Sequence, residues 1–373
     1  MSDIALEQGL GLGLDLQGHE EAEQMFLDAF NSDRLHHAWL VTGPRGIGKA
    51  ALAHKMARFL MHNPPEGNAG PSLFGDVLEK TPAESLNTDP YSGINKVITA
   101  GGHGDIVVIE RTPDEKTGKM KAEIGVNNVR VLQNFFAKTS TEGGWRVAIV
   151  DSADEMNRNA ANALLKSLEE PPKNALLILL AHAPGKLLPT ITSRCRQMRL
   201  SPLPDQAVTA ILSKQHPDLS PDEVAGYAIL SEGSPGYALK LVENQGLELY
   251  IQILESLAAM PRMNVPLAHK LADSLSLKKD EQKYVLFGEL LTRFISRLTR
   301  HVAHLNQGGP SDASPVRPVL TGELELMAEM GRRISLDQWV DLWEKVSHKM
   351  GLINLDRKQV VLNILTLLNQ SLK

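Results

Sequence analysis

Cysteine is nearly absent from this sequence, which has only Cys195 among its 373 residues. A single cysteine excludes a disulfide within the chain and a zinc site built from several cysteines. Aromatic residues make up only 5% of the chain, which argues against a surface on which nucleic-acid bases stack. No apolar run is long enough to span a membrane, and the N-terminus lacks a basic stretch before an apolar one. These absences predict a cytoplasmic protein without a metal site or a membrane partner.

Positive charge is not in excess either, because the formal net charge is -5. There is no global electrostatic attraction to nucleic acid, so any contact with DNA must be local or shared with partners. The chain is otherwise ordinary for a globular protein, with 42% hydrophobic and 22% charged residues. Its length predicts two or three domains.

The residues from Trp39 to Ala53 read as an apolar strand, a glycine-spaced loop and a helix. Gly43, Gly48 and Lys49 match the phosphate-binding P-loop, G-x-x-x-x-G-K-[ST]. The N–H groups of such a loop and the following helix N-terminus favour phosphate, and the lysine adds charge. Ala50, however, stands where a Ser or Thr hydroxyl would hold Mg²⁺. The candidate nucleotide-binding residues of this loop are Gly43, Arg45, Gly46, Gly48, Lys49 and Ala50.

In a second strand pattern, four apolar residues from Val147 to Val150 end at Asp151 and have the shape of a Walker B motif. A buried strand of this kind delivers a carboxylate to the edge where open α/β sheets bind ligands, so Asp151 joins the candidate site. Ser152 stands where a glutamate would polarise the attacking water. Asp154 and Glu155 lie beyond the strand, and we interpret them as the acidic start of a helix.

Strands alternate with helices up to about residue 202, which predicts a parallel sheet with helices on both faces. Besides the strand that ends at Asp151, we expect strands at Ala38–Val41, Ile106–Ile109, Leu176–Leu180 and near Met198–Leu200. Residues 61–104 are a loop-rich insertion with a short helix expected between Leu73 and Ser85, and residues 112–121 are a second, polar insertion.

Helical patterns dominate the rest of the chain. Ser220 to Glu223 form a capping box, which predicts the start of a helix. Three apolar stripes follow: Tyr284, Phe287, Leu291, Phe294 and Leu298; Trp339, Leu342, Trp343 and Val346; and Val361, Ile364, Leu365 and Leu368. Such stripes are typical of a bundle core. The predicted domains are therefore 1–202 (α/β), 203–245 (a helical lid) and 246–373 (all helical).

These motifs together resemble the clamp-loader family of AAA+ proteins. The resemblance is carried by the P-loop, by the run N-A-L-L-K-S-L-E-E-P-P at 162–172, and by Ser193-Arg194-Cys195. Residues 233–239 extend it into the lid, so that it covers residues 15–245 specifically and the remainder only in architecture. It implies an AAA+ RecA-like parallel-sheet domain, a small helical lid and a C-terminal helical collar through which subunits assemble.

The departures from the family pattern indicate what kind of subunit this sequence resembles. A motor subunit of the family has a P-loop hydroxyl, a Walker B glutamate, a sensor threonine and a lid arginine. This sequence has Ala50, Ser152, the run Ala181-His182-Ala183-Pro184, and Tyr237 at those positions. Arg194 is retained. The resemblance thus implies a non-hydrolysing subunit of the bacterial DNA polymerase III clamp loader, which presents Arg194 as an arginine finger to a neighbouring motor's ATP.

The resemblance also implies partners and cofactors. We expect gamma/tau and delta subunits in a heteropentamer, with the sliding clamp and primed DNA met through the complex. ATP binding to this chain is expected to be weak or absent. Family members commonly carry a four-cysteine zinc module in the interval that residues 61–104 occupy here, and this interval has no cysteine, so no zinc is expected.

Two alternatives remain open. The first is an active clamp-loader ATPase of the gamma/tau type, in which Lys49 and Asp151 suffice and a water replaces the missing hydroxyl. The second is a free-standing P-loop interaction protein whose nucleotide is structural. Arg194 counts against the second, because an arginine finger has no use without a partner site. Without the family context, Arg194 would be interpreted as a surface arginine near Arg196 and Arg199.

Overall fold

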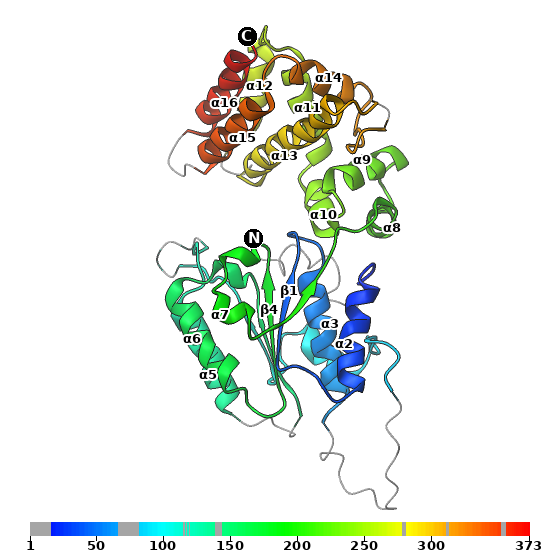
Figure 1. The fold of residues 1–373 in the computed structure, drawn as a ribbon, viewed down its shortest axis with the longest axis vertical. Helices are drawn as coiled ribbons and strands as arrows, with labels where there is room; N and C mark the ends of the chain where they lie inside the picture. The colour runs from blue at the N-terminus through cyan, green and yellow to red at the C-terminus, as the bar shows by residue number, and fades with distance from the viewer. Residues whose placement is uncertain are drawn as a thin grey trace, which may run out of the picture. The chain divides into compact units, whose positions relative to one another are not determined.

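A computed structural model describes residues 16–65, 82–114, 116, 118, 120–138, 144–277, 281–310, 313–351 and 356–373. The chain divides into two compact units (Figure 1). The first contains residues 1–208 and 233–237, and the second contains residues 209–232 and 238–373. The limits 203–245 for a separate lid stay a prediction.

The first unit is built on a five-stranded parallel sheet with the order β2-β3-β4-β1-β5. Its strands are β1 (Ala38–Thr42), β2 (Ile106–Ile109), β3 (Arg146–Val150), β4 (Ala175–Ala181) and β5 (Arg196–Arg199). Every residue of β1, β3 and β4 is buried, as expected for central strands covered on both faces. The P-loop strand β1 lies between β4 and β5, with Leu40 opposite Leu179.

Alternate residues of β1 enter two separate cores. Trp39 and Val41 pack on one face, against α2 (Glu20–Asn31) and α3 (Lys49–His62). Ala38 and Leu40 pack on the other, against α5 (Val126–Ala137) and α6 (Arg158–Glu169). Figure 1 shows both helix pairs flanking the sheet. Each large apolar side chain buried in this way contributes about 1.5–3 kcal/mol. The predicted parallel α/β architecture with helices on both faces is confirmed.

The loop-rich insertion contains a helix that the sequence did not predict. Helix α4 (Gly93–Thr99) begins at Ser92, whose hydroxyl accepts a hydrogen bond from the backbone N–H of Asn95. Residues 66–81 lie outside the described part, and with them most of the helix expected between Leu73 and Ser85. Three other short elements follow strands: η2 (Ala153–Glu155), η3 (Pro184–Lys186) and α7 (Pro189–Thr192).

The second unit is all helical, as predicted. Its helices are α9 (Pro221–Ser231), α11 (Gly246–Ala258), α12 (Val265–Ser274), α13 (Glu281–Asn306), α14 (Glu323–Gly331), α15 (Leu336–Met350) and α16 (Arg357–Ser371), while α8 (Asp205–Gln215) and α10 (Pro235–Glu243) each have residues in both units. The capping box at Ser220 and Glu223 is confirmed. The stripes on α13 and α16 are buried, but Trp343 of α15 is 43% exposed, so that stripe was predicted only in part.

One buried ionic cluster joins three helices of the second unit. The Glu323 carboxylate accepts a hydrogen bond from Tyr250 at 2.6 Å and pairs with Arg297 at 3.0 Å. Glu323 and Arg297 are 2% and 3% exposed. Burial, together with Glu323, raises the pKa of Tyr250 well above its ordinary value. Among the helices described in either unit, none is both long and apolar enough to cross a membrane.

Candidate functional site

The predicted P-loop connects β1 to α3, and its glycines let other segments approach it closely. Gly46 and Gly48 have φ angles of +70° and +110°, in the left-handed region that favours glycine. A Cβ atom on Gly46 would lie 2.8 Å from Oγ of Ser234, and one on Gly48 would lie 3.2 Å from Nε2 of His19. Side chains at these two positions would therefore push both neighbouring segments away.

The segment that begins at Ser234 is bonded directly to the P-loop. The Ser234 hydroxyl donates to the carbonyl oxygen of Arg45 at 2.8 Å, and the N–H of Gly236 donates to that of Gly46 at 2.8 Å. Tyr237 follows, 6% exposed, at the position where the family resemblance expects a lid arginine. A tyrosine cannot supply the positive charge of an arginine to a phosphate.

His19 closes the other side of the loop. It precedes the first turn of α2 and is 6% exposed, with Nε2 2.7 Å from the carbonyl oxygen of Ile47. Because a carbonyl oxygen only accepts, Nε2 carries the hydrogen of this bond. Burial lowers the pKa of His19, which favours the neutral ring. Sequence reasoning missed this contact because the two residues are 28 positions apart and share no local pattern.

Lys49 lies within the loop, as predicted, but its ammonium group binds the loop's own oxygens. Nζ donates to the carbonyl oxygens of Gly43 and Pro44 at 3.0 and 2.6 Å, and the residue is fully buried. Ala50 is 1% exposed and belongs to the apolar core beneath the sheet. A phosphate would have to draw Lys49 away from these carbonyl oxygens, and the methyl group of Ala50 cannot ligate Mg²⁺.

The structure places Asp151 directly after β3, where the Walker B pattern predicted it, and both it and Ser152 are buried. Ser152 has φ +61° and ψ 53°, a left-handed conformation that is rare for serine. Its hydroxyl lies 3.1 Å from Nε2 of His182, which follows β4, and 3.4 Å from Oδ1 of Asp151. Ser152, where the resemblance expects a glutamate, is therefore bonded to His182, one of the four residues 181–184 where the resemblance expects a sensor threonine.

Asp154 and Glu155 have specific contacts that the sequence interpretation missed. The Asp154 carboxylate accepts the backbone N–H groups of His182 and Ala183, at 3.1 and 3.0 Å. Glu155 forms ion pairs with Arg45 of the P-loop and, at 2.8 Å, with Arg111 after β2. The two acids thus connect the ends of β2, β3 and β4 to the P-loop. They are not only the acidic start of a helix.

Arg194 is not bonded to the P-loop residues of its own chain. Its Nη1 donates to the carbonyl oxygen of Thr190 at 2.9 Å, and its Nη2 pairs with Glu169 at 3.1 Å. The side chain is 39% exposed. Within the described residues these are its polar partners, so the structure brings together the predicted P-loop residues and leaves Arg194 in a separate position, facing solvent.

Metal ligands do not cluster in the described ranges, where no group of three or more His, Cys, Asp or Glu residues is placed to hold an ion. The adjacent histidines before β1 stack with ring centroids 4.4 Å apart. His36 bonds the carbonyl oxygen of Ala38 through Nδ1 at 2.8 Å, and His37 bonds that of Leu168 through Nε2 at 3.1 Å. Both rings therefore have structural partners.

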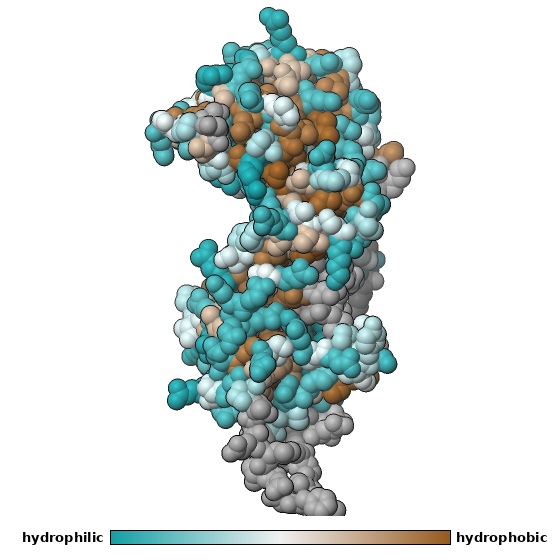
Figure 2. Space-filling view, turned by 90° about the vertical axis from the view of Figure 1, so that its right-hand side faces the viewer, coloured by the Kyte–Doolittle hydropathy of each residue, from teal (hydrophilic) through white to brown (hydrophobic). Residues whose placement is uncertain are grey.

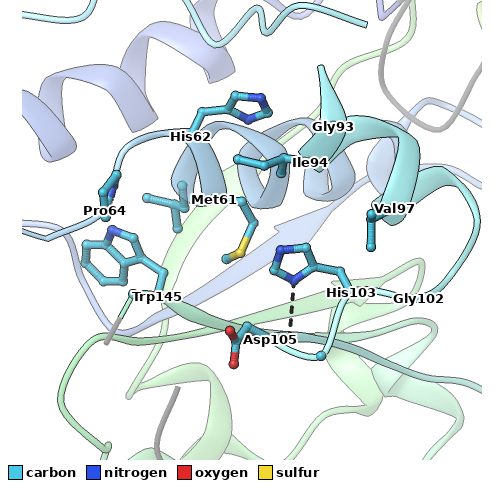
Figure 3. A pocket seen from close by; sticks show the side chains of 13 residues that line it. Met61, His62, Pro64, Gly93, Ile94, Val97, Gly102, His103, Asp105 and Trp145 are labelled. Carbon is cyan, nitrogen blue, oxygen red and sulfur yellow. Dashed lines mark hydrogen bonds between the residues drawn. The ribbon is translucent and has the colours of Figure 1, made fainter. Parts of the chain in front are cut away.

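A cavity of about 820 Å³ lies beside α4 and the end of α3 (Figure 3). Its lining includes His62, His103, Asp105 and Trp145. Asp105 precedes β2 and Trp145 precedes β3, so the cavity is at the amino edge of the sheet. Open α/β sheets bind ligands at the opposite, carboxyl edge, so this cavity is separate from the P-loop site.

Comparison with known proteins shows which family this chain resembles. A family model described as "DNA polymerase III, delta subunit" matches residues 18–204. The chain is 36% identical to the DNA polymerase III subunit delta' of Pseudomonas aeruginosa over 241 residues, which are 64% of this chain and 65% of that protein. It is 35% identical to the subunit delta' of Bacillus subtilis over 200 residues, 53% of this chain and 51% of that protein.

Other relatives are more distant. The chain is 28% identical to the DNA polymerase III subunit tau of Escherichia coli over 233 residues, 61% of this chain and 32% of that protein. Among solved structures it is similar to a DNA polymerase III gamma subunit-related protein from Thermotoga maritima, at 18% identity and a TM-score of 0.41, covering 93% of this chain and 100% of that one. The matches to the P. aeruginosa and B. subtilis delta' subunits span about half to two thirds of those proteins' lengths.

Proposed function

Because the chain belongs to the family described as DNA polymerase III, delta subunit, we propose that it acts as a delta-prime subunit of the replicative clamp loader. In this role it helps to load the sliding clamp onto primed DNA within the cytoplasmic DNA polymerase III holoenzyme. It does not hydrolyse ATP itself, and it supplies Arg194 to the ATP of a neighbouring subunit.

The observation that carries the absence of hydrolysis is the bond between Ser152 and His182. Hydrolysis by P-loop proteins needs a group that orients the attacking water, and Mg²⁺ held in part by a loop hydroxyl. Here position 152 has no carboxylate, its hydroxyl is 3.1 Å from an imidazole nitrogen, and position 50 has a methyl group. Bound ATP would supply a phosphate for the loop amides and Lys49 to hold, without the groups that turn it over.

Arg194 is suited to act in trans because its guanidinium is partly exposed and is not bonded to its own P-loop. A guanidinium can bind phosphoryl oxygens in a fixed, two-pronged geometry and stabilise the charge that develops on them. Arginine fingers supplied by a partner are worth about 10³–10⁵ in rate in well-studied NTPases. This contribution needs no nucleotide in the chain that supplies the arginine.

The partners we propose are the gamma/tau and delta subunits of a heteropentamer, assembled through the C-terminal helices. Figure 2 shows hydrophobic side chains gathered on one face of the helical unit. In that unit Val285, Val340 and Trp343 are 45%, 51% and 43% exposed, on α13 and α15. Exposed apolar groups of this kind are typical of surfaces that bind other proteins. With a net charge of -5, the chain is not the main grip on DNA.

The direct test is equilibrium binding of labelled ATP with Mg²⁺ to the isolated chain, beside steady-state hydrolysis. We expect weak or absent binding and no turnover. Tight binding with turnover that disappears in Lys49→Ala would overturn the proposal and favour an active ATPase of the gamma/tau type. Tight binding without turnover, combined with failure to assemble with gamma/tau, would instead favour a free-standing P-loop protein whose nucleotide is structural.

A further inference from the structure

The arginine proposed to act in trans has a charged partner that the P-loop chemistry does not use. Nη2 of Arg194 lies 3.1 Å from Oε1 of Glu169, the last residue of α6. Nη1 of the same guanidinium donates to the carbonyl oxygen of Thr190 at 2.9 Å. The two contacts hold the guanidinium at two of its three nitrogens, and so they fix its orientation.

Both partners are anchored in one apolar core. Leu168, directly before Glu169, is 2% exposed, and Cys195, directly after Arg194, is 9% exposed. Ile191, three residues before Arg194, is fully buried in the same cluster. Burial raises the pKa of the Cys195 thiol to about 12, so this cysteine acts as an inert apolar anchor. The backbones on either side of the ion pair are therefore held in place by the core.

The position of Glu169 is unfavourable for its own helix. The C-terminal end of a helix carries partial negative charge, and an acidic side chain there costs about 0.3–1 kcal/mol. Helix α6 nevertheless ends with Glu169, followed by Glu170, and has no acidic residue in its first turn. The Glu169 side chain is 51% exposed, so packing does not require it. Residues that break a local rule without a packing benefit are expected at functional or strained sites.

The ion pair contributes little to the stability of the fold, because exposed pairs are worth about 0–1 kcal/mol. It also leaves the guanidinium able to bind an anion. Each of Nη1 and Nη2 has a second hydrogen, and Nε has one, and the described part of the chain provides no further partner for them. The guanidinium is thus oriented by its own chain and still open to a phosphate from outside.

We infer that Glu169 is a positioning residue for Arg194: it holds the guanidinium in the orientation in which it meets the neighbouring subunit's ATP. The inference rests on the proposed function and adds to it the group that orients the finger. Preorganisation of this kind lowers the barrier, because a displacement of about 1 Å can cost up to 10²-fold in rate.

The test uses the reconstituted loader with the wild-type chain and with five variants: Glu169→Ala, Glu169→Gln, Arg194→Ala, the double variant Glu169→Ala/Arg194→Ala and the control Glu170→Ala. ATP turnover is measured with the clamp and primed DNA, and the Arg194-dependent rate is the difference between the wild-type and Arg194→Ala loaders. Glu170→Ala is the matched control, because it removes the same charge from the same helix end.

We expect Glu169→Ala to lower kcat for the Arg194-dependent rate about tenfold, with KM for ATP, assembly and melting temperature unchanged. Glu169→Gln keeps an acceptor oxygen and should fall between Glu169→Ala and the wild type. The double variant should equal Arg194→Ala, because Glu169 acts only through the arginine. Glu170→Ala should behave as the wild type.

The outcomes separate this inference from the proposed function. If Arg194→Ala lowers turnover but Glu169→Ala does not, the finger stands and the positioning role is overturned. The positioning role is also overturned if Glu169→Ala and Glu170→Ala lower turnover equally, or if Glu169→Ala lowers it further in the Arg194→Ala background. If Arg194→Ala has no effect, the finger and its positioning residue both fail.

Discussion

The hydroxyl of Ser152 lies 3.1 Å from Nε2 of His182, so the residues that follow β3 and β4 are bonded to each other across the edge of the sheet. Ser152 is 2% exposed and has a left-handed backbone conformation. A glutamate at this position, as in an active ATPase, would place a carboxylate at a buried site beside the buried Asp151.

Ser152→Glu should therefore destabilise the chain without creating activity. A buried carboxylate beside Asp151 is repelled by the like charge and is poorly solvated, so we expect a loss of about 2–4 kcal/mol. Urea unfolding and ATP turnover measure the two effects. Ser152→Asn is the control, because asparagine tolerates the left-handed conformation and adds bulk without a charge, so it should cost less than Ser152→Glu. A Ser152→Glu chain as stable as the wild type that hydrolyses ATP would show that this bond does not explain the lack of activity.

The stability of the folded chain should depend on pH because of His54, a buried residue of α3. It is 7% exposed, and in the described structure neither ring nitrogen has a hydrogen-bond partner. Burial, with a smaller contribution from Arg58, lowers the pKa of His54 from 6.5 to about 4. Between these values the unfolded chain binds a proton that the folded chain does not, so stability falls as the pH drops from about 6.5 towards 4. The full loss is about 3 kcal/mol.

His54→Leu should reduce this pH dependence, because leucine fills a similar space and does not titrate; the part that remains comes from other groups such as His19, whose pKa burial also lowers. The measurement is the free energy of unfolding in urea from about pH 7.5 to about pH 4.5, a range that covers most of the His54 titration. The exposed His269→Leu serves as the control and should leave the slope unchanged. An equal slope in the wild type and in His54→Leu would contradict the burial of an uncharged histidine.

Helices and strands that depend on local sequence patterns could be predicted. Strand β2 was predicted residue for residue, because a strand of a parallel sheet leaves a continuous apolar run in the sequence. The capping box at Ser220 is local in the same sense. Trp343 satisfies the helical period of α15 but lies at the rim of its apolar side, which periodicity alone does not resolve.

The surroundings of the P-loop were not predictable in this way. The contact between Ser234 and Arg45 joins residues 189 positions apart, and the pair Glu155–Arg45 joins residues 110 positions apart. Such contacts depend on how the chain folds back on itself and leave no trace in local spacing. One signal was available: Glu169 and Glu170 stand at the unfavourable end of a helix, which could have marked Glu169 before the structure was known.

The buried carboxylate of Glu323 should be essential to the stability of the helical unit. Glu323→Gln removes the charge that Arg297 needs, and breaking a buried pair in this way costs about 3–5 kcal/mol. Hydrogen exchange of the α11 and α13 amides reports the stability of this unit directly. Glu329→Gln removes an exposed pair with Arg333 and should cost about 0.5 kcal/mol or less. Equal protection in the two variants would contradict the role given to the cluster.

The most direct test of the account compares two variants in the reconstituted loader, Arg194→Ala and Asp151→Asn. The first removes the group offered to a neighbour, and the second removes the carboxylate that this chain would need for its own catalysis. We predict that Arg194→Ala lowers the rate at the neighbouring site by about 10³ or more, while Asp151→Asn leaves turnover unchanged. Full turnover with Arg194→Ala and lost turnover with Asp151→Asn would show instead that this chain is itself a motor.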